Sequence, residues 1–369
     1  MVRAIAVLGG LAGLLAIIPA GLRFGAIGLD ATVGAEQKLG WESVWDRPSS
    51  EATIRRLGNA VDAGRMSQHL FHLAKDPLPY RKLNFTVPGH SKNTLYETDD
   101  YLAGKLESCG YRVQREGVRV QAFRRDITKP KQDQYSPPLP DDPWYTAYNL
   151  YAELKGRSRP GVIILLVAHK DSQSWIHSPG ANDNAIGTVS VLEMACVLAG
   201  YTPECTIRFL LCNEEHTPWT SVTAAKNARK RGDRIVAVLN IDGVGGKTAA
   251  ESARGKQTNV SAYTKPQGAR LAELMRAVNA RFSIGLEQRA VQRTSPGDDD
   301  GSFVQSGYPA AIINIGSWPY SDPNYHSEGD IPEKSDVPNA AKVVKATLGA
   351  VLTIDQDPAI LSTGGAHPE

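Results

Sequence analysis

The chain has 369 residues, of which 41% are hydrophobic and 22% are charged. This is the composition of an ordinary globular protein that can bury a large core, and it excludes disorder throughout the chain. With 41 basic and 39 acidic residues, the net charge of +2 gives no electrostatic case for nucleic acid as a partner.

The first predicted element is a continuously apolar segment, residues 4–22, which has Arg3 on one side and Arg23 on the other. As a helix rising about 1.5 Å per residue, it comes close to spanning a ~30 Å hydrocarbon core. It also fits a secretory signal that ends at small residues such as VGA at 33–35. We therefore predict that residues 1–35 are a signal peptide or membrane anchor. The protein is then exported, either periplasmic or extracellular, or membrane-anchored and facing outward.

Helical periodicity predicts a helix near 51–73 and a second helix over 93–110, and a strand-like segment follows at 111–123. Residues 129–143 are too rich in proline for a helix or a central strand, so we expect an exposed loop between edge strands. Alternating polar and apolar residues then predict a strand over 146–154.

From residue 161 onward, short apolar runs alternate with helical segments. The predicted strands are 161–169, 206–213, 235–242 and 310–316, and the predicted helices are 186–200, 219–232, 268–282 and one around 338–353. Such alternation requires crossover connections, which favour a parallel sheet covered on both faces. We predict an α/β fold with a mostly parallel twisted central sheet and helices on both faces, as one domain over residues 36–369.

Four cysteines, an even number, permit disulfides in an oxidising compartment. They are Cys109, Cys196, Cys205 and Cys212, and no CxxC spacing indicates a zinc–thiolate site. Cys196 and Cys212 lie in an apolar helix and an apolar strand, so we interpret both as buried free thiols.

Metal-ligand side chains follow the predicted strands where each strand ends. They are His169 and Asp171 after the first strand, Glu214 and Glu215 after the second, Asp242 at the end of the third, and His326 in a loop beyond the last. Each alone is common as a cap or turn residue. Ligands bind at the carboxyl ends of such strands, however, and several buried charges at one edge are costly without a cation. The pattern therefore predicts a metal site.

The ligand types narrow the choice of metal. Imidazole nitrogen and carboxylate oxygen without thiolate suit zinc, and less commonly manganese or cobalt. Two ions about 3.5–4 Å apart would share one carboxylate as a bridge. Asp183, in the turn PGANDNA, is suited to bridging the two ions. Asp171 is suited to orienting one of the ligands without binding the metal itself.

Six motifs between about Leu83 and Ile354 resemble, in order, those of the M28 zinc metallopeptidases. They are HKD (169–171), SPGANDNAIG (178–187), NEE (213–215), NIDGVG (241–246), GYPAAIINIG (307–316) and PNYHSEGDIPEKSD (323–336). The resemblance implies a zinc-aminopeptidase-like (phosphorylase/hydrolase-like) fold with two zinc ions. One zinc would be held by His169 and Glu215, the other by Asp242 and His326, with Asp183 bridging, Glu214 as general base and Asp171 supporting the site. It also implies a cis peptide bond between Asp183 and Asn184.

By this resemblance the protein is an aminopeptidase that hydrolyses peptides with a free N-terminus. A hydroxide bridging the metals attacks the carbonyl after Glu214 has taken its proton. The alternatives are a glutaminyl-cyclase-like acyltransferase with one zinc, a carboxypeptidase, and a metal-free, non-catalytic scaffold. The complete set of ligands favours hydrolysis.

Two departures from the family pattern bear on substrate preference. HTPWTS at 216–221 replaces a glycine- and leucine-rich stretch and is expected to reshape the rim of the pocket, with His216 as an exposed loop histidine. Asp300 stands where many relatives carry histidine.

Overall fold

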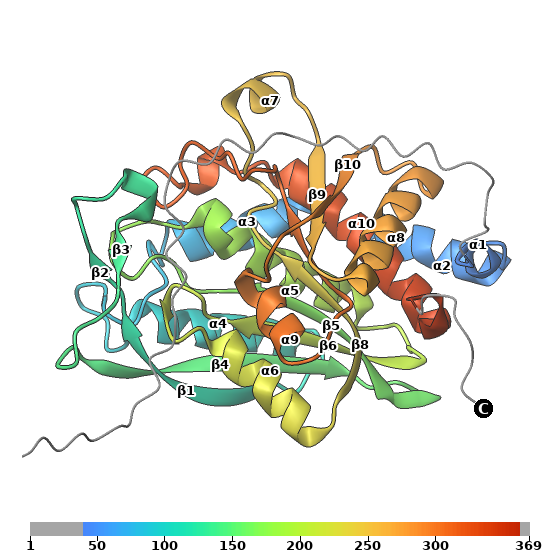
Figure 1. Cartoon of the computed structure of the whole chain (residues 1–369), viewed down its shortest axis with the longest axis horizontal. Coiled ribbons are helices and arrows are strands. Elements are labelled where there is room, and N and C mark those ends of the chain that lie inside the picture. The colour runs from blue at the N-terminus through green and yellow to red at the C-terminus, as the bar shows by residue number, and fades with distance from the viewer. Residues whose placement is uncertain (1–39, 362–369) are drawn as a thin grey trace, which may run out of the picture. The chain divides into compact units, whose positions relative to one another are not determined.

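A nine-stranded sheet runs through the part of the chain that the computed structural model describes, residues 40–361 (Figure 1). The segment predicted as a signal or anchor, residues 1–35, lies outside the described residues. Among the helices of residues 40–361, none combines the length and apolar character needed to cross a membrane.

The centre of this sheet is parallel and its margins are mixed. Its strands are β1 (Gln114–Ala122), β4 (Trp144–Leu154), β5 (Arg159–His169), β6 (Cys205–Cys212), β7 (His216–Thr217), β8 (Arg234–Ile241), β9 (Thr258–Tyr263), β10 (Glu287–Gln292) and β11 (Ala311–Ile315). They lie in the order β10-β9-β11-β8-β5-β6-β4-β1-β7. The neighbours β11, β8, β5 and β6 are parallel, whereas β11 with β9, β6 with β4, β4 with β1, and β1 with β7 are antiparallel. The predicted α/β fold is confirmed, with a sheet that is mixed as a whole.

The helices are α1 (Glu42–Trp45), α2 (Pro48–Asn59), α3 (Ala63–Ala74), α4 (Thr94–Ser108), α5 (Ile186–Leu198), α6 (Thr220–Arg231), α7 (Ala249–Ala253), α8 (Pro266–Arg281), α9 (Asp298–Gln305) and α10 (Val337–Gln356). The single helix predicted near 51–73 is two helices, α2 and α3. The break has a local cause, because the Asp62 carboxylate accepts hydrogen bonds from the backbone N–H groups of Gly64 and Arg65 and caps α3.

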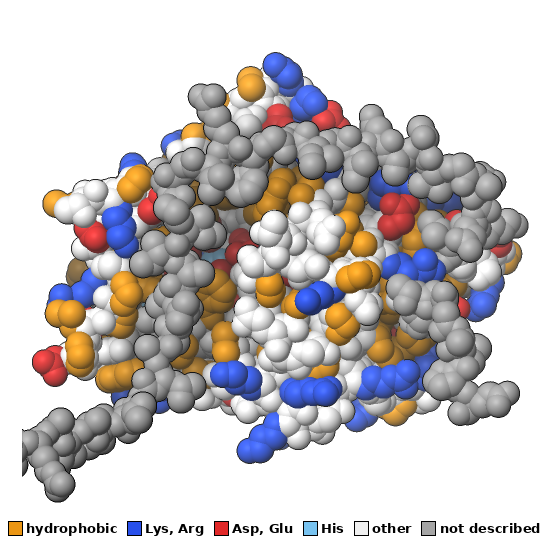
Figure 2. Space-filling model, viewed as in Figure 1, with side chains coloured by type: hydrophobic (Ala, Val, Ile, Leu, Met, Phe, Trp, Pro, Cys, Tyr) orange, Lys and Arg blue, Asp and Glu red, His pale blue; other side chains and the backbone are white. Residues whose placement is uncertain are grey.

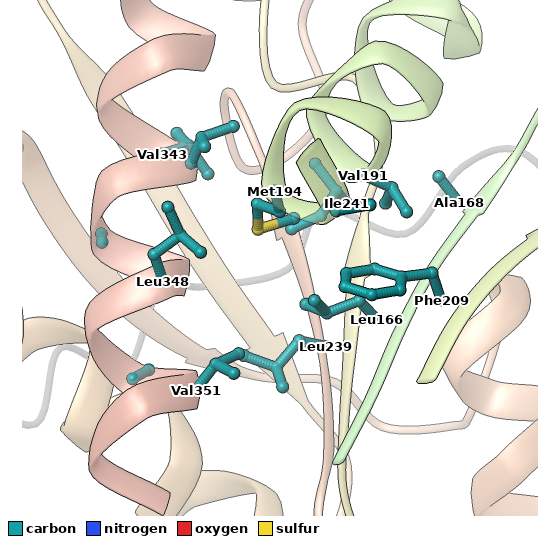
Figure 3. Packing of buried hydrophobic residues seen from close by; sticks show 14 of the residues in the cluster. Leu166, Ala168, Val191, Met194, Phe209, Leu239, Ile241, Val343, Leu348 and Val351 are labelled. Atoms are coloured by element: carbon teal, nitrogen blue, oxygen red, sulfur yellow. The ribbon is translucent and has the colours of Figure 1, made fainter. Parts of the chain in front are cut away.

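Residues of β5 pack alternately on the two faces of the sheet. Ile164, Leu166 and Ala168 join the core beneath α5 and α10, part of which Figure 3 shows. Ile163 and Leu165 point the other way, into a smaller core with residues of α6 and α9. This double burial explains why the strand is a continuous apolar run. It also fixes the strand rigidly up to its last residue.

The cysteine prediction was half right. Cys205 and Cys212 are buried free thiols, but Cys196 in α5 forms a disulfide with Cys109 at the end of α4. The two Cα atoms are 5.3 Å apart, within the range that a disulfide needs. The bond ties α4 to the helix that starts beside the predicted metal site.

The proline-rich segment is exposed, as predicted, but has structure of its own. It carries a small two-stranded sheet of β2 (Arg124–Arg125) and β3 (Tyr135–Ser136), joined through a short 3-10 turn, η1 (Lys131–Asp133). We call residues 124–136 the β2–β3 hairpin. In Figure 1 it lies apart from the nine-stranded sheet, at the left of the view.

Candidate metal centre

Three of the predicted ligands meet because their strands are parallel neighbours. His169 is the last residue of β5, Asp242 directly follows β8, and Glu215 follows β6 by three residues. The order β8-β5-β6 places the three carboxyl ends at one edge of the sheet. His169, Asp183, Glu215 and His326 are all less than a tenth exposed.

Asp183 reaches the same edge from a tight turn, Ala181–Ala185, between β5 and α5. The turn is anchored by Asp330, whose carboxylate accepts hydrogen bonds from the backbone N–H groups of Asn182 and Asp183 at 2.8 and 3.0 Å. The Asp183–Asn184 peptide bond is cis, which confirms the expectation from the resemblance.

His326 comes from the loop after β11 and has a positive φ of 49°, which is uncommon for a residue with a side chain. Its Nδ1 atom lies 2.6 Å from the backbone carbonyl oxygen of Gln132, in the β2–β3 hairpin. A carbonyl oxygen can only accept a hydrogen bond, so Nδ1 carries the proton. The lone pair of the neutral ring is then on Nε2, which faces the carboxylates.

Each histidine Nε2 atom faces two carboxylate oxygens. That of His169 is 3.2 Å from Asp183 Oδ1 and 3.5 Å from Asp242 Oδ2. That of His326 is 3.2 Å from Asp183 Oδ2 and 3.6 Å from Glu215 Oε1. Ligand atoms 2.0–2.2 Å from a tetrahedral zinc lie about 3.3–3.6 Å apart, so the donor set fits zinc at both positions.

These distances favour a pairing that differs from the one implied by the resemblance. They group His169 with Asp242 and His326 with Glu215, whereas the sequence motifs suggested the opposite partners. In both pairings Asp183 is shared, because its two carboxylate oxygens face different histidines.

Asp171 does not face the metal positions but positions the residues around them through hydrogen bonds. Its Oδ1 atom accepts a hydrogen bond from the backbone N–H of Glu214, and its Oδ2 atom accepts one from that of Glu215, both at 2.9 Å. Burial favours the neutral acid, but hydrogen bonds from His169 and His216 outweigh it and hold the pKa of Asp171 below its usual range. Asp171 therefore contacts the backbone of two adjacent glutamates and the rings of two histidines at once.

His216 is not the exposed loop histidine that the sequence predicted. It is fully buried, with Nδ1 2.8 Å from Asp171 Oδ2, and its Nε2 atom accepts a hydrogen bond from the backbone N–H of Leu83 at 3.3 Å. The cause is β7, where residues 216–217 pair with β1 and turn the ring inward. Asp300 is likewise buried and paired with Arg293.

The carboxyl group of Glu214 also lies close to the metal position formed by His169 and Asp242. Ligand atoms of His169, Glu214 and Asp242 lie within 4.8 Å of one another. Its Oε2 atom is buried and has no hydrogen-bond partner among the described residues. Burial, followed by the nearby charges of Asp299 and Asp298, raises the pKa of Glu214 well above its usual value. An unpartnered carboxyl held next to the ligands can exchange a proton with a molecule bound there.

Sequence reasoning missed Gln173, which lies within the site. Its amide nitrogen donates to Asp183 Oδ2 at 2.8 Å and to Glu215 Oε1 at 2.9 Å, the two oxygens that face His326. Gln173 is fully buried and sits only two residues beyond Asp171. A glutamine in a loop carries no ligand signal of its own, so only the structure shows it.

The centre opens into a cavity of about 340 Å³. Its walls combine carboxylates with aromatic and aliphatic side chains: Phe123, Tyr135, His169, Trp175, Asp183, Glu214, Glu215, Trp219, Asp242, Gly243, Asp298, Ile313, Ile315, Trp318, Tyr320, Tyr325 and His326. Trp219 comes from HTPWTS, so this stretch shapes the pocket as expected. Figure 2 shows acidic side chains and a histidine recessed in the visible face, beside hydrophobic side chains.

Known proteins similar to this chain include peptidases. A "Probable zinc metalloprotease" of Pyrenophora teres f. teres is 26% identical over 262 residues, which cover 58% of this chain and 53% of that protein. "Leucine aminopeptidase 1" of Trichoderma harzianum is 25% identical over 329 residues, 85% of this chain and 77% of that protein. The crystal structure of the Legionella pneumophila LapA aminopeptidase shares the fold, with a TM-score of 0.62 and 17% identity over 83% of this chain and 75% of that one.

The chain thus spans about half the length of the first of these curated relatives. The model of one family, described as peptidase family M28, matches residues 149–351. That range contains His169, Asp183, Glu215, Asp242 and His326, and it covers more than half of the chain. The chain belongs to peptidase family M28.

Proposed function

We propose that this chain is a zinc-dependent aminopeptidase with two metal positions. The observation that carries the proposal is the spacing of the ligands, because each histidine Nε2 atom and its two carboxylate oxygens are separated as they would be around a tetrahedral zinc. Bound zinc would supply Lewis-acid chemistry, lowering the pKa of water and polarising a carbonyl. The excess of buried carboxylates over histidines gives a further reason for a cation.

The side chains divide into three roles. His169 and Asp242 would bind one zinc ion, and His326 and Glu215 would bind the other. Asp183 would bind both ions. Glu214 takes the proton of the attacking water and returns it to the leaving amine. Asp171 is a positioning residue that keeps the Glu214 and Glu215 backbone and the His169 ring in place.

The cavity supports exopeptidase action on a free N-terminus. Its volume of about 340 Å³ suits the end of a peptide more than a long stretch of chain. Asp298, on the cavity wall, adds a carboxyl group beyond the ligands. It is ion-paired with Arg293 at 2.7 Å, and its side chain can still accept a hydrogen bond from a substrate ammonium group, which a blocked N-terminus lacks.

The test is metal content together with release of free amino acid from matched unblocked and N-acetylated peptides. We expect near two zinc ions per chain and cleavage of the unblocked peptides only. Metal without such cleavage would contradict the aminopeptidase and favour cyclisation of N-terminal glutamine, which the same preparation can be assayed for. A chain that binds no metal would be a non-catalytic scaffold.

We also propose that the protein acts outside the cytoplasm. The apolar segment 4–22 motivates this proposal, and the Cys109–Cys196 disulfide supports it, because such bonds persist in oxidising compartments. Fractionation of cells that express the full-length chain, with a cytoplasmic marker enzyme as control, tests it. Recovery with the cytoplasmic marker, and with reduced cysteines, would overturn it.

A further inference from the structure

The β2–β3 hairpin contributes no core. From residue 122 to residue 146, no side chain is buried. Ile127 near its turn is 75% exposed. A segment with few buried contacts can open without unfolding the sheet beneath it. Its contacts with the rest of the protein must therefore explain why it is ordered where it is.

Those contacts converge on His326 and its loop. The Gln132 carbonyl accepts the hydrogen bond from His326 Nδ1 at 2.6 Å. The Tyr135 ring meets the His326 ring edge-on, with centroids 5.9 Å apart. Two residues further along the loop, Glu328 lies 3.7 Å from Arg125 and 3.5 Å from Lys131, both on the hairpin.

Trp175 packs between the hairpin and His326. Its ring packs against Tyr135 at 5.3 Å, Phe123 at 5.8 Å and His326 at 5.0 Å between centroids. Phe123, next to the hairpin, and Tyr135 also line the cavity. The hairpin is thus both a wall of the cavity and the support of one metal ligand.

We propose that the β2–β3 hairpin is a positioning element for the metal site, which holds His326 through the Gln132 carbonyl and thereby sets how firmly the ion beside His326 is retained. The hydrogen bond fixes the ring orientation and keeps the proton on Nδ1, so that Nε2 stays available to the metal. When the hairpin undocks, His326 loses this support, whereas His169 keeps the contact of its Nδ1 atom with Asp171. The inference rests on the proposed metal centre.

The test is the rate at which zinc-loaded, full-length protein releases zinc to an excess of a chromogenic chelator. In the main variant, Gly-Ser replaces residues 128–133, which removes the Gln132 carbonyl and Lys131 but leaves β2, β3, Arg125 and Tyr135. Loss of a partner that orients a metal-binding histidine typically weakens binding about 10–100-fold. We therefore expect one of the two release phases to accelerate by about that factor, with the other unchanged.

Gln132→Ala is the matched control. Among the described residues the exposed Gln132 side chain has no hydrogen bond, and alanine keeps the backbone carbonyl, so zinc release should remain at the wild-type rate. Melting of the metal-free proteins is the second control. The shortened hairpin should leave it nearly unchanged, because no buried side chain is removed.

Glu328→Lys keeps the inference testable if the shortened chain does not fold. It places a positive charge next to Arg125 and Lys131, so the same release phase should accelerate, and Glu328→Gln should have a smaller effect. Wild-type release rates in both the shortened and Glu328→Lys proteins would overturn the inference, as would equal acceleration by Gln132→Ala. Failure of wild-type protein to bind zinc would instead overturn the proposed function.

Discussion

The Nδ1 atom of His216 lies 2.8 Å from Oδ2 of Asp171, and both side chains are fully buried. Asp171 therefore has a partner on each side, with His216 behind it and His169 in front, at 3.3 Å from its Oδ1 atom. A carboxylate confined in this way cannot rotate without breaking several hydrogen bonds. Through Asp171 this contact is linked to the backbone of Glu214 and Glu215 and to the ring of His169.

The first prediction concerns Asp171→Asn. An amide of the same size must point its NH₂ group at backbone N–H or ring donors, so at least one donor loses its acceptor. We expect kcat to fall about 10–100-fold, with KM less affected and zinc bound more weakly. Steady-state kinetics with zinc analysis checks this, and unchanged kcat would show that Asp171 does not position the glutamates.

Glu214→Gln should separate metal binding from turnover. The amide keeps the size of the side chain but cannot accept the proton of the attacking water. General acid–base groups typically contribute about 10²–10⁴-fold to the rate of a reaction. The kcat of the variant should therefore fall about 100-fold or more, while its zinc content stays near the wild-type value. Glu215→Gln is the matched control and should lose zinc. Near-normal turnover in Glu214→Gln would remove Glu214 from its role as the base.

Gln173→Leu tests a residue that the sequence did not suggest. The variant removes the amide that donates to Asp183 and Glu215. We expect zinc affinity to fall about tenfold, because groups that orient ligands affect metal binding on this scale. Gln288→Leu, on β10 at the far edge of the sheet, should not change it. Equal zinc affinity in the two variants would show that Gln173 only fills space.

The ligands on strand ends could be predicted because their signal is local. A continuous apolar run followed by His169 or Asp242 predicts both a buried strand and a polar group at its carboxyl end, and parallel pairing then brings these ends together. Polar strands lack that signal. β9 and β10 were not predicted, because their sequences TNVSAY and EQRAVQ contain few apolar residues.

Contacts between distant segments could not be predicted for a different reason. The hydrogen bond from His326 to the Gln132 carbonyl joins residues 194 positions apart, and a backbone carbonyl leaves no trace in the residue type. The orientation of His216 depends on the pairing of β7 with β1, two residues long, in a stretch that reads as a loop because of Pro218. These features come from tertiary structure and not from local pattern.

Removal of metal should destabilise the protein. Without cations, the carboxylates of Asp183 and Glu215 are buried next to that of Asp242, and desolvation raises the pKa of Asp242 to about 7. A ligand present at 1,000 times its dissociation constant stabilises the folded state by about 4 kcal/mol, so chelation should lower Tm by several degrees. Differential scanning calorimetry with chelator, and then with zinc restored, checks this. An identical Tm in all three conditions would contradict a metal centre that contributes to stability.

The final prediction concerns the Cys109–Cys196 disulfide. It closes a loop with a sequence separation of 87 residues between α4 and α5, and the chain-entropy model assigns such a bond about 4.6 kcal/mol. Cys109→Ser with Cys196→Ser should therefore lower the free energy of unfolding by up to that amount, measured by urea denaturation of oxidised protein. Reducing agent should lower the stability of the wild type in the same way and leave the double variant unchanged.

Catalysis at temperatures well below the unfolding transition should persist in the double variant, because the ligands are held by β5, β6 and β8 and by Asp330. A wild-type protein whose unfolding is insensitive to reductant would show that the bond contributes nothing to stability.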